Sequence, residues 1–261
     1  KRFKEGVFEP SESRFCVRRS ELDDQLRINP QAYLPHLNET IRQIEAIEQR
    51  HGWSVSALGQ LDPNIAVFKG PRLKSEKIIV ESPEGGPNIE PYYTPSAVLQ
   101  DKSDSVKWLD LDKASESQLR TIDAIRVRRG DIVITRSGSI GRISMVTRRL
   151  DGAIVSDDLI RVRVPDDDLR WYLFAFLQTR YAYNQMLRNE YGAVQQHLEP
   201  EHVREILVPI PEDFREIAQV IAAAKVQMGH KEASESFHRR TLELSDELMT
   251  DLIGTDPETS V

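Results

Sequence analysis

Short apolar runs separated by turn residues occupy the middle of the chain, from about residue 54 to residue 164. The runs are KIIV at 77–80, DIVIT at 131–135, RISMV at 142–146 and LIRVRV at 159–164. Turn sequences such as PEGGP, RRG and LDG lie between them, and this punctuation predicts a β-sheet. In LIRVRV apolar residues alternate with Arg161 and Arg163. The alternation predicts a half-buried strand whose two arginines share one face.

The apolar spacing becomes helical on both sides of this segment. Residues 39–50 predict a helix because isoleucines recur on neighbouring turns, with Asn38 as its cap. Residues 166–191 carry a second helical pattern, and we expect its aromatic side chains in the core. A short helix near Pro200 and an extended, proline-bounded strand are expected to close the domain.

A helix of roughly forty residues is predicted after Pro211, with two apolar stripes whose register changes at residues 229–231. Such a long helix with a narrow apolar seam cannot bury itself on one domain, so we expect a second helix as its partner. The seam residues expected to face that partner are Ile217, Ile221, Met228, Phe237, Leu244 and Leu248. Removal of residues 213–261 should then abolish assembly and leave the domain folded. The alternative is a helix that packs back on its own domain.

Charge is distributed unevenly along the 261 residues, whose net charge is −7. Residues 120–150 contain eight arginines and two acidic residues, a balance of +6, whereas residues 212–261 contain five basic and eleven acidic residues, a balance of −6. The first segment is suited to an anion, and the second is suited to avoiding one or to meeting a basic protein. The alternative is that both segments are only solvated faces.

The chain lacks the patterns that several kinds of active site require. Its single cysteine, Cys16, cannot form an internal disulfide, and the six histidines show no metal-ligand spacing. There is no [DNS]PP[YFW] run for an amino-methyltransferase, no PD…ExK pattern for a nuclease, and no GK[ST] ending after GSIG. We therefore expect no catalytic or metal site in this chain. The absence of an apolar leader or span predicts a cytoplasmic protein.

Three short stretches carry side chains suited to duplex DNA. In GDIVITRSGSIGRISMV two strand-like runs flank a turn in which glycines and hydroxyls can approach a phosphate. A paired glutamine can bond adenine through its carboxamide, and FKGPRLKSEK is a second basic cluster. The candidate DNA-contacting residues are Lys69, Arg72, Lys74, Arg136, Ser137, Ser139, Arg142, Gln195 and Gln196. The alternative for the turn is a hairpin exposed by default.

The order of these parts resembles the target recognition domain and conserved helix of type I restriction-modification specificity subunits. GDIVITRSGSIGRISMV, SDDLIRVRVPDD, WYLFAFLQTR and GAVQQHLEPEHVREILVPIP follow one another before the long helix, so that the resemblance covers about residues 54–253. It implies that the domain reads one half of a bipartite double-stranded DNA target. It also implies that the helix docks a DNA methyltransferase and, where restriction accompanies methylation, an endonuclease subunit. S-adenosylmethionine would belong to the methyltransferase, and no cofactor is expected here.

Members of that family usually carry two such domains separated by two helices that form an antiparallel pair. This chain has one domain, one helix and no internal repeat. The departure implies either a half-subunit that pairs with its own copy, or the specificity part of a fused methyltransferase. The first residue is Lys, which favours the second.

We therefore predict an α+β fold: a β-rich target recognition domain with a helical layer, followed by a long C-terminal helix of coiled-coil type. The expected organisation is a lead-in with a helix at 1–53, the recognition domain at 54–211, a spacer and dimerisation helix at 212–253, and a disordered tail at 254–261. Two other classes of function stay open at this point. One is a protein-interaction scaffold that does not bind DNA, and the other is a stand-alone nuclease.

Overall fold

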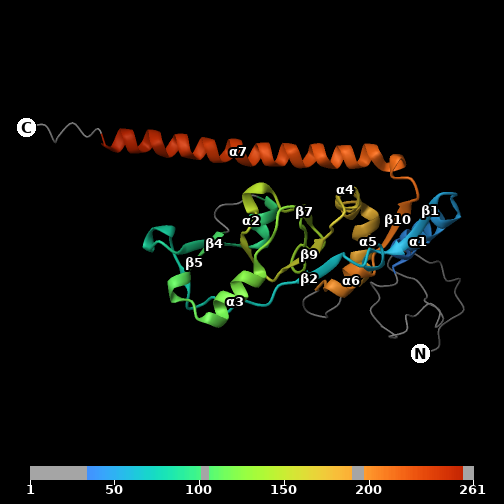
Figure 1. Cartoon of the computed structure of the whole chain (residues 1–261), viewed down its shortest axis with the longest axis horizontal. Coiled ribbons are helices and arrows are strands. Elements are labelled where there is room, and N and C mark those ends of the chain that lie inside the picture. Colours follow the sequence, from blue (N-terminus) through green and yellow to red (C-terminus); the bar gives the residue numbers. More distant parts are fainter. Residues whose placement is uncertain (1–33, 101–105, 190–196, 255–261) are drawn as a thin grey trace, which may run out of the picture.

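Three small sheets, flanking helices and one long helix make up the part of the chain that the computed structural model describes, residues 34–100, 106–189 and 197–254 (Figure 1). The first sheet pairs β1 (Trp53–Ala57) with β10 (Leu207–Pro211). The expected strand at the end of the domain is therefore present. It pairs antiparallel with residues 53–57, and so brings the beginning and the end of the domain together.

The central sheet has the strand order β2-β9-β6-β7 and is antiparallel throughout. Its strands are β2 (Ala66–Lys69), β9 (Leu159–Arg163), β6 (Ile132–Thr135) and β7 (Ile143–Met145). β6 and β7 form the hairpin that the sequence predicts, with Ile132 opposite Met145. The third sheet, β3-β5-β4-β8, is smaller. It consists of β3 (Ile79–Val80), β5 (Val106–Asp110), β4 (Ile89–Tyr93) and β8 (Ile154–Val155).

Strand β9 is buried on both faces, which corrects the expectation of a half-buried strand at 159–164. Ile160 and Val162 belong to the large core under the helices, and Leu159 belongs to a second cluster on the other face. Arg161 is fully buried, and its guanidinium donates to the carbonyl oxygens of Ala124, Ile125 and Arg126. Backbone carbonyls at the end of a helix thus replace the water that the alternation had suggested.

The two arginines of this strand do share a face, as predicted. The guanidinium carbons of Arg161 and Arg163 lie 5.6 and 5.4 Å from the ring centre of Phe68. Arg163 also donates twice, at 2.8 Å each, to the buried carboxylate of Asp131. Both cations are therefore occupied inside the domain.

Helices cover the central sheet and supply its apolar core. α4 (Asp167–Leu177) is capped by Asp166, whose carboxylate accepts from the backbone N–H of Leu169. α5 (Arg180–Asn189) follows directly. Tyr183 is an exception to the expected aromatic core, because it is 42% exposed.

The predicted N-terminal helix begins earlier than its sequence signals suggest. α1 (Pro35–Glu45) starts with a proline in its first turn, where a missing N–H costs no hydrogen bond, and continues as a 3-10 turn to Gln49. Asn38 lies inside the helix and does not cap it. The other short helices are α2 (Pro95–Gln100), α3 (Glu116–Ile125) and α6 (Pro200–Arg204).

The long C-terminal helix is present as α7 (Ala218–Gly254), preceded by a 3-10 turn at Phe214–Ile217. In Figure 1 it is a straight rod along one side of the molecule, and its far end reaches beyond the sheets. Ile217, Ile221 and Met228 are buried in the main core. They pack on their own domain and not on a partner, so the expectation of one continuous partner-facing seam is corrected: only Phe237, Leu244 and Leu248 of the six are exposed.

None of the helices in the described ranges is both long enough and apolar enough to cross a bilayer.

Candidate nucleic-acid interface

The loop between β6 and β7 is a tight turn organised around Thr135. The backbone N–H of Gly141 donates to the carbonyl oxygen of Thr135 at 3.0 Å, and the N–H of Arg142 donates to its hydroxyl at 2.9 Å. Gly138 and Gly141 have φ angles of 70° and 74°, in the left-handed region that favours glycine. The turn is therefore closed by its own backbone, with a defined shape.

The two glycines differ in their surroundings. A Cβ on Gly138 would have no atom within 4 Å, so this glycine lies at an open tip. A Cβ on Gly141 would lie 3.1 Å from the ring of Tyr183 and 3.2 Å from the sulfur of Met186, so this glycine lets the loop lie against α5. The open side carries Ser139, which is exposed.

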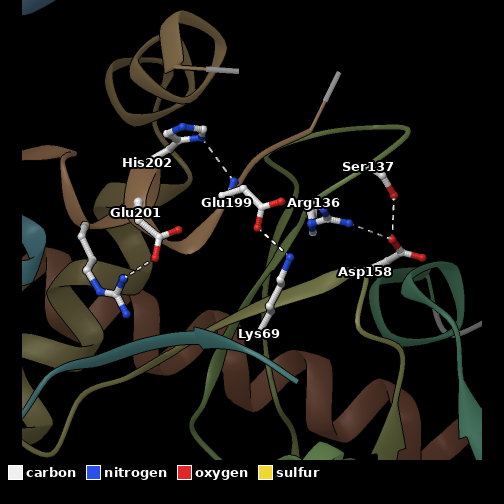
Figure 2. A network of polar contacts seen from close by, with 8 residues as sticks. Lys69, Arg136, Ser137, Asp158, Glu199, Glu201 and His202 are labelled. Atoms are coloured by element: carbon white, nitrogen blue, oxygen red, sulfur yellow. Dashed lines mark hydrogen bonds and ion pairs between the residues drawn. The ribbon is translucent and has the colours of Figure 1, made fainter. Parts of the chain in front are cut away.

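A network of polar contacts joins the start of this turn to two distant parts of the chain (Figure 2). Arg136 donates from Nη2 to Glu199 Oε1 at 2.6 Å, and Lys69 donates from Nζ to Glu199 Oε2 at 2.8 Å. Arg136 Nη1 also lies 3.8 Å from Asp158 Oδ1, to which the Ser137 hydroxyl donates at 3.1 Å. Two of the expected DNA-contacting cations, Lys69 and Arg136, are thus brought together, and both are paired with carboxylates.

Glu199 was not among the residues expected at this site. Burial raises the pKa of its carboxyl, but hydrogen bonds and charge interactions with Arg136 and Lys69 outweigh burial and lower the pKa to about 2. The carboxylate is therefore ionised at neutral pH, and it neutralises part of the positive charge at this end of the central sheet. Glu199 also caps α6 in a reciprocal arrangement with His202.

The other candidate cations remain open to solvent. Arg142, Arg72 and Lys74 are exposed. Arg142 lines an open hollow of about 730 Å³ together with Gln178 and Tyr183. Within the described ranges no carboxylate lies within ion-pair distance of Arg142, so this guanidinium is available to an anion.

The paired glutamines, Gln195 and Gln196, lie outside the described residues. The described chain resumes at residue 197, and Leu198 donates its backbone N–H to the carbonyl oxygen of Arg136 at 2.9 Å. The segment that follows the glutamines is therefore attached to the hairpin. Their own position stays a prediction.

Much of the basic segment at 120–150 pairs with carboxylates of the same chain. Arg126 donates twice to Glu90, at 2.7 and 2.9 Å. Arg129 donates to both oxygens of Glu232 on α7, at 3.2 and 3.1 Å, and Arg149 lies 3.7 Å from Glu235. The charge asymmetry read from the sequence is thus used in part to hold α7 on the domain.

No group of three or more His, Cys, Asp and Glu side chains suited to a metal ion occurs within residues 34–100, 106–189 and 197–254. The polar side chains brought together at the hairpin are cations, hydroxyls and the carboxylates that pair with them. Such a set can bind and orient an anionic polymer.

Comparisons with known proteins give one family match. A family model described as "Type I restriction modification DNA specificity domain" matches residues 51–225. No curated protein sequence matches the chain.

Several solved structures resemble the chain at low sequence identity. The S subunit of a type I restriction-modification system from M. genitalium is 16% identical, with a TM-score of 0.48 over 78% of this chain and 46% of that one. The HsdS subunit from Thermoanaerobacter tengcongensis is 17% identical, with a TM-score of 0.44 over 77% and 46%. The type IIG restriction endonuclease BpuSI is 14% identical, with a TM-score of 0.51 over 80% and 30%. The chain thus spans about half the length of the two subunits.

Proposed function

Because the chain belongs to the type I restriction-modification DNA specificity family, we propose that it recognises one half of a bipartite duplex DNA target for a restriction-modification complex. In this proposal the chain has no catalytic site of its own. Methylation, and S-adenosylmethionine with it, belongs to a methyltransferase subunit or domain that the chain directs to its target. An endonuclease subunit joins where restriction accompanies methylation.

One observation from the structure supports DNA recognition most directly: basic groups that are distant in sequence meet at one end of the central sheet. Lys69 at the end of β2 pairs across the sheet with Ile160, which also pairs with Ile134 of β6. Lys69 therefore lies at the same end of the sheet as the turn with Arg136 and Arg142. Basic side chains at this end of the sheet, beside an open hairpin tip, suit the phosphates and groove edges of a duplex.

A salt titration of duplex binding tests this function. Binding measured by fluorescence anisotropy should weaken steeply between about 50 and 200 mM salt, because each phosphate that the protein neutralises releases counterions. Arg142→Ala should reduce the slope of log K against log salt by about 1. Arg239→Ala removes the same charge from the exposed surface of α7 and serves as the control. Failure of the wild-type chain to bind any duplex would favour the scaffold alternative.

A stand-alone nuclease is tested in the same samples. If the chain alone cut the duplex when Mg²⁺ is added, the proposal of a non-catalytic recognition subunit would be wrong.

The outer half of α7 supports assembly with a second helix. Phe237 is 75% exposed, Leu248 59% and Leu244 48%. Val226, 58% exposed, lies eleven residues before Phe237, and Leu248 lies eleven residues after it. Eleven residues correspond to three helical turns plus about 20°, so the three side chains share one face of the helix. Met228 lies nine residues from Phe237, about 180° around the helix. The exposed stripe is thus opposite the face that packs on the domain.

We propose that this stripe pairs with a second copy of α7 in the antiparallel orientation. Residues 241–254 contain four acidic and no basic residues, so a parallel pair would place two acidic ends side by side. An antiparallel pair centred on Phe237 places Val226 opposite Leu248 and sets the acidic ends beside residues 220–233. A methyltransferase could then dock on the paired helices.

A further inference from the structure

Glu199 holds two cations at the end of the central sheet where DNA is proposed to bind. Its two carboxylate oxygens are used separately, one by Arg136 at 2.6 Å and the other by Lys69 at 2.8 Å. The three side chains come from different segments: the end of β2, the turn after β6, and the residue before α6. Figure 2 shows the three side chains converging, with the carboxylate of Glu199 close to both cations.

The network lies at the surface and not in the core. The side chain of Lys69 is 38% exposed, that of Arg136 is 16% exposed and that of Glu199 is 17% exposed. An approaching phosphate would meet Lys69 first. Carboxylate and phosphate oxygens are both anionic acceptors that Lys and Arg bind through short, charge-assisted hydrogen bonds. Glu199 therefore occupies, with its own carboxylate, a place where a phosphate could be held.

Among the described residues that Figure 2 joins around Glu199 and Arg136, positive and negative charges are equal in number. Lys69 and Arg136 contribute two positive charges, and Glu199 and Asp158 contribute two negative charges. Sequence-independent binding to DNA comes almost entirely from cations that neutralise phosphates. A carboxylate that occupies two such cations therefore weakens binding that depends on phosphate contacts alone, unless further contacts offset the cost of displacing it.

We infer that Glu199 restrains sequence-independent binding to DNA by keeping Lys69 and Arg136 paired. This inference rests on the proposed function. On a target sequence, contacts with base edges add to the phosphate contacts and offset the separation of the carboxylate from its two cations. On any other duplex they do not, and the two cations stay occupied.

The test compares Glu199→Gln with Glu201→Gln on a mixed-sequence duplex, using the full chain. Glutamine keeps the size of the side chain and an oxygen that can cap α6, but it removes the charge. Glu201 lies two residues further on, is 67% exposed and pairs with Arg204, so it is a control for the same change in net charge. Glu199→Gln should bind several-fold more tightly at about 100 mM salt, with a salt slope steeper by about 1 to 2.

A second pair of variants separates release of the two cations from a general effect of charge. Arg136→Ala should weaken binding less in the wild-type chain than in the Glu199→Gln variant, because only the variant releases Arg136 from the Glu199 carboxylate. In the Glu199→Gln background the same change should remove most of the gain in affinity. Thermal unfolding of each variant checks that the chain is folded.

The outcomes distinguish this inference from the proposed function. If the wild-type chain binds no duplex, the proposed function is wrong and the inference is lost with it. If the wild-type chain binds with a steep salt dependence while Glu199→Gln binds equally or more weakly, only the inference is overturned. A gain in affinity of the same size in Glu201→Gln would overturn it as well.

Discussion

Arg161 and Arg163 are structural residues, although their alternation with apolar neighbours is typical of a solvent-facing pair. Burial lowers the pKa of Arg161 to about 10, and its guanidinium satisfies three carbonyl oxygens at the end of α3 and just beyond it. Arg163 balances the buried Asp131. Unpaired buried charges are costly, so these contacts are required wherever the strand is covered on both faces. The number of arginines in a segment therefore overstates the charge that DNA can use.

Glu199→Gln is expected to change how domain stability depends on pH. Burial raises the pKa of this carboxyl, and the opposing contacts from Arg136 and Lys69 lower it overall from its usual 4.5 to about 2. Because the folded-state pKa is the lower one, the carboxylate stabilises the fold above pH 4.5, and this contribution is lost as pH falls toward 2.

Urea unfolding at a series of pH values measures the effect. The unfolding midpoint of the wild-type chain should fall more steeply than that of Glu199→Gln across this acidic range, and Glu201→Gln should follow the wild type. Parallel curves for the wild type and Glu199→Gln would show that the ion pairs with Arg136 and Lys69 do not stabilise the domain.

At the scale of elements, α7 has two halves with different roles. Its first half completes the core through Ile221, Ala224 and Met228 and is held by polar contacts that include Glu232. Lys231 also donates to the hydroxyl of Ser144 at 2.6 Å. Its second half has exposed apolar side chains. The helix is therefore part of the domain up to about residue 235, and the side chains of residues 236–250 are exposed.

This division changes the outcome expected from truncation. Removal of residues 213–261 would expose the core that Ile217, Ile221 and Met228 cover, so the remaining chain should lose cooperative unfolding. Removal of residues 236–261 should leave a folded domain that no longer self-associates. Thermal unfolding and sedimentation of the two truncated chains check this.

Point variants give a matched comparison of the two faces of α7. Met228→Ala should cost about 2 to 4 kcal/mol of unfolding free energy, and Leu248→Ala should change monomer stability by less than about 0.5 kcal/mol. An equal loss of stability in both variants would contradict the division of the helix.

Local signals in the sequence were enough to predict several of these elements. The hairpin of β6 and β7 and the helix α4 follow from alternation, glycine placement and apolar spacing. α3 was missed, although Ser115 and Gln118 form the capping box that marks its start. The network at Glu199 could not be predicted, because its partners lie 63 and 130 residues away in the chain. Which apolar residues of α7 are buried on the domain and which are exposed likewise depends on contacts between distant segments.

At the scale of the whole molecule, the two proposed functions belong to different parts: DNA recognition to the domain and assembly to α7. The proposed DNA-binding surface lies at one end of the central sheet. The exposed stripe of α7 points away from the face that packs on the domain. In an antiparallel pair the two domains would therefore lie at opposite ends of the paired helices, with a separation set by the length of α7. Such a spacing suits a target whose two halves are separated by a fixed number of base pairs.

Single-cysteine cross-linking tests this arrangement, in a background where the native Cys16 is replaced by Ser. A two-fold axis at Phe237 places this residue beside its own copy, so Phe237→Cys should form a disulfide-linked dimer on mild oxidation. Leu244→Cys should not, because in an antiparallel pair two such residues lie about 21 Å apart along the helix axis. A parallel pair would cross-link both variants, and a helix that pairs only with another protein would cross-link neither. Either result would contradict antiparallel self-pairing through α7 without affecting the case for DNA recognition.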